Sequence, residues 1–548
     1  MLVVYYSMLI AWVVNAFFDS FGSNDPWGQP GVNGTVAVDY FVNEIIGRGT
    51  LAEDGSPTRI VPANVGYSAL VWVICFCGTA FGVEWTGRVT YFTMGVPVIL
   101  LFVFLGRAMT LEGHELGVKE YIGRWDMSVL TEQGDVWSTA VSQIFFSIGV
   151  TFGIMTAFGS YCPRGDPVVI NSFVIALSNS FFSIISGFAV FAALGHLSFT
   201  SGIPVTDLPF AGFSLVFGTW PVVLGTLPGG EHWVRLLFFD LFLLGIDSAF
   251  AFNEAISTVI QDTRYFCETP KWKIQGCICV CGFLLSLMYA TDAGLDFLDV
   301  IDFYINFVML LVGFFECYAA GWVYGIDKQF ERCGRPAILM YQVANFASVI
   351  IACGIWFGAK SIWGGFVALI LTYAVFGGLS VILLKQHAPD LPMGEALWAL
   401  SFENIFDLKE RIEPVTQWIP GVWCILVKQF IPHILIILFI NLAQSDNGDG
   451  EPIFGGYGGY TMEPYQVMGI LTFVLTTVLF TVGFVFPVLY KPLALPDGHV
   501  ALNPDEAGKP ENTKGEGSEQ QEDEEQDDAK NIEDEVQPVK VDGEEVNA

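Results

Sequence analysis

The stretch 136-VWSTAVSQIFFSIGVTFGIMTAFGSY-161 is long and apolar enough to cross a lipid bilayer, yet Gly149, Thr151 and Gly153 interrupt it halfway along. Glycine destabilises a helix, and lipid offers no water to the backbone groups that a break exposes. A broken span therefore indicates a substrate or ion site near the middle of the membrane, where protein or a hydrated cavity receives those groups. The alternative interpretation is that the glycines only let two helices pack closely.

The same stretch carries a polar face. Gln143, Ser147 and Thr151 recur every four residues, so they lie on one side of a helix. Polar side chains inside a membrane segment are costly, and they usually mark a functional site. The stripe therefore favours a binding site over simple helix packing.

The composition is that of an integral membrane protein. Hydrophobic residues make up 53% of the 548, aromatic residues make up 15%, and the mean hydropathy is +0.54. This predicts an all-α protein with about twelve apolar runs long enough to span a bilayer. The expected spans cover approximately residues 1–19, 66–84, 88–107, 136–160, 168–196, 233–261, 273–290, 297–324, 337–357, 362–384, 419–443 and 464–490.

The negative charge is concentrated at the C-terminus. From Ala501 onward there are 17 acidic residues and four lysines, which account for 13 of the 32 net negative charges. We expect residues 491–548 to form a disordered acidic tail, because they contain few large apolar residues. Acidic residues there argue against nucleic-acid or membrane-surface binding, both of which require Lys and Arg.

Neither the cysteines nor any short motif indicates an enzyme. Most of the eleven cysteines lie in or beside apolar spans, where cysteine behaves as a small hydrophobic residue. The alternation of Cys277, Cys279 and Cys281 would direct ligands to different helix faces, which disfavours a metal site. The sequence contains no zinc, phosphate-loop or dinucleotide motif, so we expect no enzymatic activity.

Loop charges suggest an orientation. The polar loop after the first span contains Asn33 in an Asn-Gly-Thr sequence, which is a glycosylation acceptor if the loop is outside the cell. That placement puts the loops 262–272, 325–336 and 385–418 in the cytoplasm, where they contribute many of the lysines and arginines. The acidic tail is then also cytoplasmic, and the plasma membrane is the expected location.

Two polar clusters lie within apolar spans. In one, Asp247 and Ser248 supply hard oxygen ligands suited to a small cation; the alternative is an aspartate neutralised by a neighbouring helix. In the other, Asn179 and Ser183 are four residues apart and could hold an anion with their neutral donors. From spacing alone, hydrogen bonding between helices is the more common role of such residues.

Aspartates also lie at the ends of two spans. Asp299 and Asp302 begin the span 297–324, and Asp262 ends the span 233–261. In the orientation above, Asp302 is near the outer face and Asp262 near the inner face. They suit a pair of gates, although a solvated aspartate at a helix end is an equally good interpretation of each.

Five segments together resemble the sodium- and chloride-dependent neurotransmitter/amino-acid symporter family (the neurotransmitter:sodium symporters). They are YYSMLIAW (5–12), WTGRVTYFT (85–93), AVSQIFFSIG followed by FG (140–153), SYC with NSFFSIISGF (160–188), and LLGIDSAF with a following Glu (243–254). The resemblance implies a bundle of inverted repeats like that of the bacterial leucine transporter. It covers residues 1–326, similar to spans three to ten, and 419–490, similar to the last two spans.

The resemblance implies roles for individual residues. Tyr6 would bind the substrate carboxylate, Phe146 would close over it, and Phe152 would line the pocket with Ser248, Ala249 and Phe252. Ligands of two sodium ions would come from Ser147 and Asn179 at one site, and from Leu244, Asp247 and Ser248 at the other. Chloride would be bound by Gln143, Ser147, Asn179 and Ser183. Asp302 would act at the outer gate, and Asp262 with Tyr161 at the inner gate.

The sequence also departs from the family pattern. It begins at what resembles the third span, so it is expected to lack the first two spans and the arginines that would pair with Asp262 and Asp302. The family's Gly-Pro-Gly break reads Gly149-Val150-Thr151, and Phe252 occupies a position that is often small, which implies a compact pocket. By comparison with the family pattern, we expect residues 327–418 to be an inserted segment with two extra spans.

The expected function is sodium-coupled, chloride-dependent symport of a small amino acid or related amine, with Na⁺ and Cl⁻ moving with the substrate. The alternative is a truncated member that does not transport and acts as a membrane binding or regulatory protein. The sequence leaves open the substrate, the ion stoichiometry, the role of the extra spans and the oligomeric state.

Overall fold

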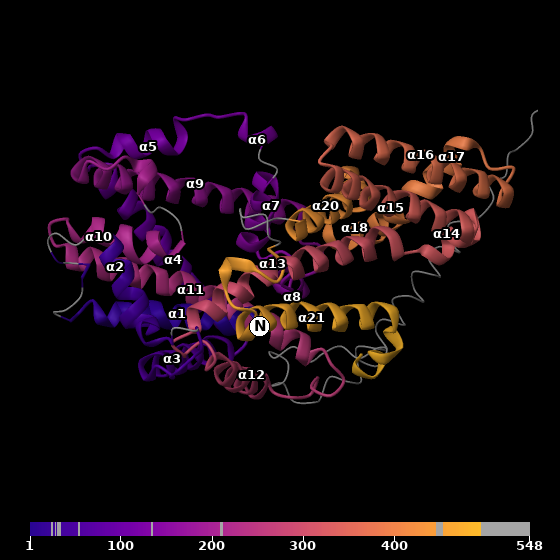
Figure 1. Cartoon of the computed structure of the whole chain (residues 1–548). Helices are drawn as coiled ribbons and strands as arrows, with labels where there is room; N and C mark the ends of the chain where they lie inside the picture. Colours follow the sequence, from indigo (N-terminus) through magenta and orange to yellow (C-terminus); the bar gives the residue numbers. More distant parts are fainter. Residues whose placement is uncertain are drawn as a thin grey trace, which may run out of the picture. The chain divides into compact units, whose positions relative to one another are not determined.

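The computed structural model describes residues 1–22, 26–27, 29, 34–52, 55–132, 135–208, 212–444 and 453–494. These residues are almost entirely helices and connecting turns, with one isolated β-bridge between Ile60 and Thr291 (Figure 1). They lie in one unit, Met1–Pro496. The glycosylation acceptor Asn33 and the acidic tail beyond residue 494 lie outside the described residues.

Each of the twelve expected spans coincides with helix. Nine helical segments in the described residues are long and apolar enough to cross a membrane: α1 (Leu2–Asp19), α3 (Pro62–Thr79), α4 (Val83–Ala108), α9 (Val168–Ser201), α13 (Gly294–Tyr318) with its extension to Val323, α15 (Arg335–Ala359), α16 (Ile362–His387), the segment Gly421–Gln444 that ends in α20 (Ile431–Gln444), and the segment Met462–Val485 that contains α21 (Val467–Val485). An all-α membrane protein is therefore confirmed.

The other three expected spans are irregular in length or composition. α11 (Gly230–Gln261) has 32 residues but is interrupted by polar ones, and α12 (Lys271–Ser286) has only 16. The third is split into α7 (Asp135–Ile148) and α8 (Ile154–Ser160). The total of twelve crossings stays a prediction.

The core is built around α1 and α11. α11 packs against α1, α3, α4, α8, α10 (Trp220–Gly225) and α12, and α1 is the most enclosed of the nine apolar helices. A Cβ atom added at Gly245 on α11 would lie 2.9 Å from Ile10 Cγ1 on α1. Glycine therefore allows these two helices the close approach that is typical of membrane bundles.

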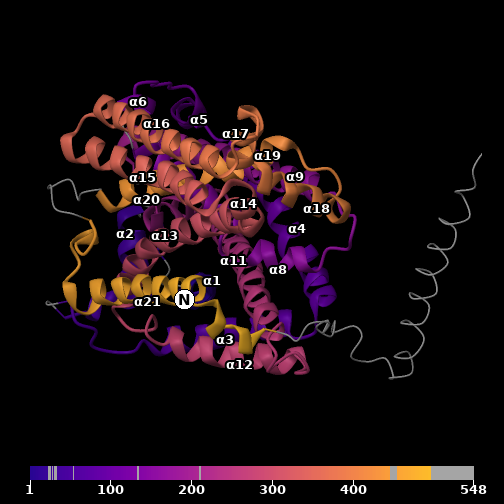
Figure 2. The same cartoon turned by 90° about the vertical axis from the view of Figure 1, so that its right-hand side faces the viewer.

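The C-terminal helices pack on α13. α20 and α21 both contact α13, although each begins more than 100 residues after α13 ends (Figures 1 and 2). The expected insertion contains the hairpin α15–α16, followed by α17 (Met393–Ser401) and α18 (Glu403–Thr416). α15 also contacts α20, so the hairpin is attached to the rest of the bundle through the same helix.

Candidate functional site

The predicted helix break is present. α7 ends at Ile148 and α8 begins at Ile154, and between them Gly149, Thr151 and Gly153 have φ angles of 73°, 72° and 78°. The N–H of Gly149 donates to the carbonyl of Phe146 (3.2 Å), and that of Val150 to the carbonyl of Phe145 (3.0 Å). This is the Schellman pattern, in which a left-handed glycine closes a helix and satisfies its last carbonyls.

Thr151 lies where the broken segment meets α13. Its left-handed backbone is unusual for a β-branched residue, and its hydroxyl is buried without a hydrogen-bond partner among the described residues. Its methyl group would lie 3.0 Å from a Cβ atom added at Gly313 of α13. Buried polar groups normally have partners, so the broken segment offers a hydroxyl that a bound ion, solute or water can satisfy.

Four aromatic side chains connect the break to α1 and α11. Phe152 lies between Phe146 and Phe252, with ring centroids 5.9 Å and 5.8 Å away, and Phe252 lies 5.8 Å from Tyr6. Every contact is edge-to-face, the favourable geometry for aromatic pairs. We refer to Tyr6, Phe146, Phe152 and Phe252 as the aromatic quartet. The structure thus brings together four of the predicted substrate-binding residues from three separate segments.

The predicted oxygen ligands on α11 lie beside the quartet. Ser248 Oγ donates to the carbonyl of Leu244 (3.3 Å), and Asp247 Oδ1 accepts a hydrogen bond from Thr93 Oγ1 on α4 (2.6 Å). The neighbouring residue Ala249 is fully buried. A carbonyl, a hydroxyl and a carboxylate within one helical turn are the hard ligands that a small cation requires.

An apolar cavity adjoins the same helices. It has a volume of about 430 Å³, and its wall includes Tyr6 and Leu9 from α1 and Leu244 and Gly245 from α11. Tyr6 and Leu244 therefore belong both to the predicted site and to a space beside it.

The predicted chloride and first sodium residues lie on α7 and α9. Ser147 Oγ donates to Asn179 Oδ1 (2.9 Å), and Ser183 Oγ donates to the carbonyl of Asn179 (2.8 Å). Gln143 is exposed on the same helix as Ser147. The structure thus brings three of these four residues together, and their side chains are connected by hydrogen bonds to Asn179.

At the predicted outer gate, Asp302 Oδ1 accepts a hydrogen bond from Tyr5 Oη (2.6 Å). One turn earlier, Asp299 accepts hydrogen bonds from Tyr457 Oη (3.3 Å) and Tyr460 Oη (2.9 Å) in the loop before α21. Burial, and then the charge of Asp299, raise the pKa of Tyr457 to about 12, so its hydroxyl remains a donor at neutral pH. Asp299 and Asp302 are therefore held by tyrosines.

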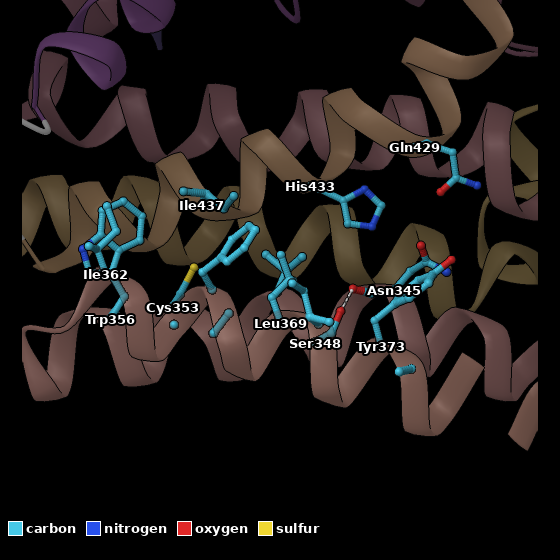
Figure 3. A pocket seen from close by; sticks show the side chains of 16 residues that line it. Asn345, Ser348, Cys353, Trp356, Ile362, Leu369, Tyr373, Gln429, His433 and Ile437 are labelled. Carbon is cyan, nitrogen blue, oxygen red and sulfur yellow. Dashed lines mark hydrogen bonds between the residues drawn. The ribbon is translucent and has the colours of Figure 1, made fainter. Parts of the chain in front are cut away.

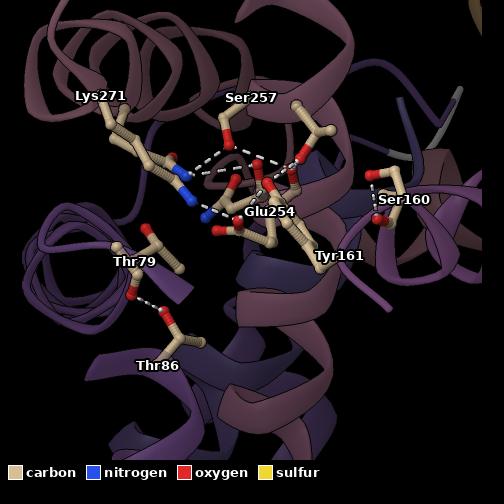
Figure 4. A network of polar contacts seen from close by, with 12 residues as sticks. Thr79, Thr86, Ser160, Tyr161, Glu254, Ser257 and Lys271 are labelled. Atoms are coloured by element: carbon tan, nitrogen blue, oxygen red, sulfur yellow. Dashed lines mark hydrogen bonds and ion pairs between the residues drawn. The ribbon is translucent and has the colours of Figure 1, made fainter. Parts of the chain in front are cut away.

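At the predicted inner gate, Tyr161 contacts Glu254 and Thr258 (Figure 4). Its hydroxyl lies 3.0 Å from Glu254 Oε1 and 2.7 Å from Thr258 Oγ1. Glu254 also forms an ion pair with Lys271 at the start of α12, and the two side chains are 0% and 3% exposed. Asp262 lies directly after α11, and its side chain forms no ion pair within the described parts of the chain.

Three functional candidates escaped the sequence analysis. In the sequence, Thr93 is only one residue of a family motif, Lys271 is only a loop cation, and Tyr460 carries no signal. Lys271 had one available signal, since it lies 17 residues after Glu254, an acidic residue inside an apolar helix.

Several known proteins are similar in sequence to this chain. The profile described as "Sodium:neurotransmitter symporter family" matches residues 36–360. The human sodium- and chloride-dependent neutral and basic amino acid transporter B(0+) is 35% identical over 266 residues, which cover 48% of this chain and 41% of that transporter. The bovine sodium- and chloride-dependent taurine transporter is 30% identical over 480 residues, or 81% of this chain and 70% of that protein. The bovine sodium- and chloride-dependent GABA transporter 2 is 30% identical over 358 residues, or 60% and 59%.

Proposed function

Because the chain belongs to the sodium:neurotransmitter symporter family, we propose that it carries a small amino acid or related amine across the membrane together with sodium, in a chloride-dependent manner. The relatives named above are transporters of amino acids, taurine and GABA. The observation that carries the proposal is the aromatic quartet, which joins a broken helix to the carboxylate-bearing part of α11.

The substrate would lie among the quartet. Tyr6 Oη would donate to a carboxylate, and the rings of Phe146 and Phe152 would exclude water from the apolar part of the solute. Phe252 fills space between Phe152 and Tyr6, so the site would favour compact solutes. Ser248 and Ala249 would form the wall that α11 contributes.

Sodium would bind beside the substrate as a co-transported ion. The Leu244 carbonyl, Asp247 and Ser248 would hold one ion, and Thr93 would orient the carboxylate of Asp247 through the hydrogen bond described above. Ser147 and Asn179 would turn their oxygens toward a second ion. Binding drives a conformational change only if the ion prefers one state, so these ligands must be arranged differently in the two states.

Chloride and the gates complete the proposal. Gln143, Ser147, Asn179 and Ser183 would hold chloride with neutral donors, a counter-anion beside the sodium charge. Asp302 with Tyr5 would close the outer side, and the Tyr161–Glu254–Lys271 group the inner side, near Asp262. The protein would act at the plasma membrane, with its acidic tail in the cytoplasm.

Uptake into proteoliposomes tests the proposal. The full chain would be reconstituted, and an inward sodium gradient imposed with chloride or gluconate outside. Labelled neutral and basic amino acids, taurine and GABA form the substrate panel. We expect accumulation of at least one solute that requires sodium and falls when chloride is replaced. Asp247→Asn should abolish it, whereas the matched variant Asp240→Asn, a buried carboxylate on the same helix, should retain most of it.

The alternative function, a member that binds without transporting, gives a different result. Sodium-dependent binding of a panel solute without accumulation would favour it. Neither binding nor uptake of any panel solute would reject the proposed function, as would uptake that Asp247→Asn leaves unchanged.

A further inference from the structure

A second cavity lies away from the aromatic quartet. It has a volume of about 590 Å³ and lies between the α15–α16 hairpin and the helix that ends in α20 (Figure 3). The hairpin supplies most of the lining, and Gln429, His433 and Ile437 supply the rest. None of these residues takes part in the proposed transport site, so the cavity needs a separate explanation.

The lining has two ends of different chemistry. Asn345, Ser348, Tyr373 and Gln429 gather at one end, and Trp356 with other apolar side chains lies at the opposite end (Figure 3). None of the sixteen lining residues is Asp, Glu, Lys or Arg. Burying a charged group without a partner is costly, so the lining selects a neutral ligand with one polar end and a long apolar body.

The polar end of the cavity offers two side-chain oxygens as hydrogen-bond acceptors. Asn345 Nδ2 donates to the Tyr341 carbonyl (2.8 Å), and Gln429 Nε2 lies 3.2 Å from Tyr341 Oη. The side-chain oxygens of both amides make no hydrogen bond within the described residues. The His433 ring stacks on Phe346, with centroids 5.4 Å apart and planes 12° apart, which fixes its orientation. A ligand hydroxyl can donate to one of the two amide oxygens at this end.

The cavity opens toward lipid. On α16, Ile362, Phe366 and Ile370 are 57%, 54% and 52% exposed, and both helices of the hairpin are apolar enough to cross a membrane. By contrast, Asn345 and Ser348 at the polar end are buried. A ligand that reaches the polar end therefore passes an apolar opening, as a molecule dissolved in the bilayer would.

We propose that this cavity binds one sterol-class membrane alcohol, with its hydroxyl group at Asn345 and Gln429 and its ring system against Trp356 and Phe366. Asn345 and Trp356 are eleven residues apart on α15, which gives a rise of about 16 Å and an elongated space suited to a single rigid body. Flat aromatic side chains pack well against flat rings. A rigid sterol also loses less conformational entropy on binding than a flexible acyl chain does.

Photolabelling tests this proposal on the full chain. Vesicles that contain the protein would be irradiated with a diazirine-bearing sterol, and labelled peptides identified by mass spectrometry. Label is expected in the peptides of α15, α16 and α20. Ala352→Trp fills the cavity and should reduce that label about fivefold or more. The matched variant Val375→Trp places the same bulk at an exposed position of α16 outside the lining and should leave it unchanged.

A second comparison tests the polar end. The 3-O-methyl ether of the probe cannot donate, so the wild-type protein should label with it about three- to tenfold less. Gln429→Leu removes an acceptor and should narrow the difference in labelling between the probe and its ether. Ile437→Leu changes only an apolar part of the same wall and should leave that difference unchanged.

Three outcomes would overturn the assignment. One is label that Ala352→Trp does not change. Another is a diazirine fatty alcohol that labels the site while the sterol does not. The third is capture of a second copy of the chain through this face. Transport is not the readout, so failure here leaves the proposed function standing, and loss of transport leaves this result intact.

Discussion

Removing Lys271 should test whether the inner polar group is a functional gate. Lys271→Met keeps most of the unbranched side chain, one atom shorter, and deletes its charge. The variant leaves Glu254, which is 0% exposed, with the Tyr161 hydroxyl at 3.0 Å as its remaining donor to that oxygen (Figure 4). Because the pair joins α11 to the start of α12, and Tyr161 ends the helix after the break, its loss should loosen this end of the bundle.

The size of the effect follows from burial. Deleting one partner of a buried ion pair costs about 3 to 5 kcal/mol, because the other charge stays buried and uncompensated. Tyr161 still donates to Glu254, so we expect the lower end, about 3 kcal/mol, or more than a hundredfold in the equilibrium. The double variant Lys271→Met/Glu254→Gln removes both charges and should recover about 2 kcal/mol of that loss.

Two measurements separate stability from gating. Thermal denaturation in detergent, followed by size-exclusion chromatography, gives the stability of the wild type, the two single variants Lys271→Met and Glu254→Gln, and the double variant. Accessibility is read from Ser257→Cys, because Ser257 is fully buried and accepts a hydrogen bond from Gln275 (2.9 Å). A membrane-impermeant maleimide should label Cys at position 257 slowly in the Ser257→Cys protein that retains Lys271. It should label the same position much faster when Ser257→Cys is combined with Lys271→Met.

An exposed pair provides the control. Arg88 and Glu84 are 3.6 Å apart, and their side chains are 73% and 71% exposed. Arg88→Met should change neither the melting temperature nor the labelling rate, because such surface pairs contribute little. If Lys271→Met behaves like Arg88→Met in both assays, the pair is not a structural lock. If the double variant is no more stable than Lys271→Met, the electrostatic reasoning is wrong.

Three further changes probe the break, the cation site and the outer loops. Gly149→Ala should destabilise the protein by about 1 to 2 kcal/mol, since φ is 73°, while Gly95→Ala inside α4 should be neutral or stabilising in the same thermal assay. Thr93→Val should raise the sodium concentration for half-maximal uptake about three- to tenfold by removing one of the hydrogen bonds that hold Asp247, and Thr93→Ser should restore it. Burial raises the pKa of Asp292, but hydrogen bonds from Thr58, Arg59 and Thr50 outweigh burial, so the folded pKa is lowered. The stabilisation from Asp292 is therefore fully present above its pKa in the unfolded chain, about 4, and is lost as the pH falls through its folded pKa. Proteolysis of the loop that contains Thr58 should increase in acid. It should also increase at neutral pH in the Asp292→Asn variant.

The sequence predicted those features that depend on neighbours along the chain. Span positions follow from apolar length, which the bilayer imposes on each helix separately. The break followed from Gly149 and Gly153, because a left-handed backbone without a Cβ penalty is a local property of glycine. The aromatic quartet followed from family resemblance, since no spacing relates Tyr6 to Phe252.

Lateral partners could not be predicted in this way. Apolar helices show little sequence preference for a given neighbour, because lipid and protein surfaces are similarly apolar. Thr93 finds Asp247 across 154 residues, and Tyr460 finds Asp299 across 161. The sequence places Lys271 in the predicted cytoplasmic loop 262–272, whereas in the structure it begins α12 and is buried against Glu254.

The helix break makes α8 a separate short helix that connects the aromatic quartet to the Glu254–Lys271 ion pair. α8 begins after the break and packs on α11 through Ile154, Ala157 and Ala255, in a cluster that Phe152 and Phe252 also join. Its other end leads to Tyr161, which contacts Glu254. The seven residues of α8 span about 10 Å, so one short helix joins the aromatic quartet to the inner ion pair. Because the break separates α8 from α7, a solute that shifts Phe152 can move α8 against the small side chains of α11 without moving the outer half. Under the proposed function, such a shift would strain the contact of Tyr161 with Glu254, and a bound solute would in this way open the predicted inner gate.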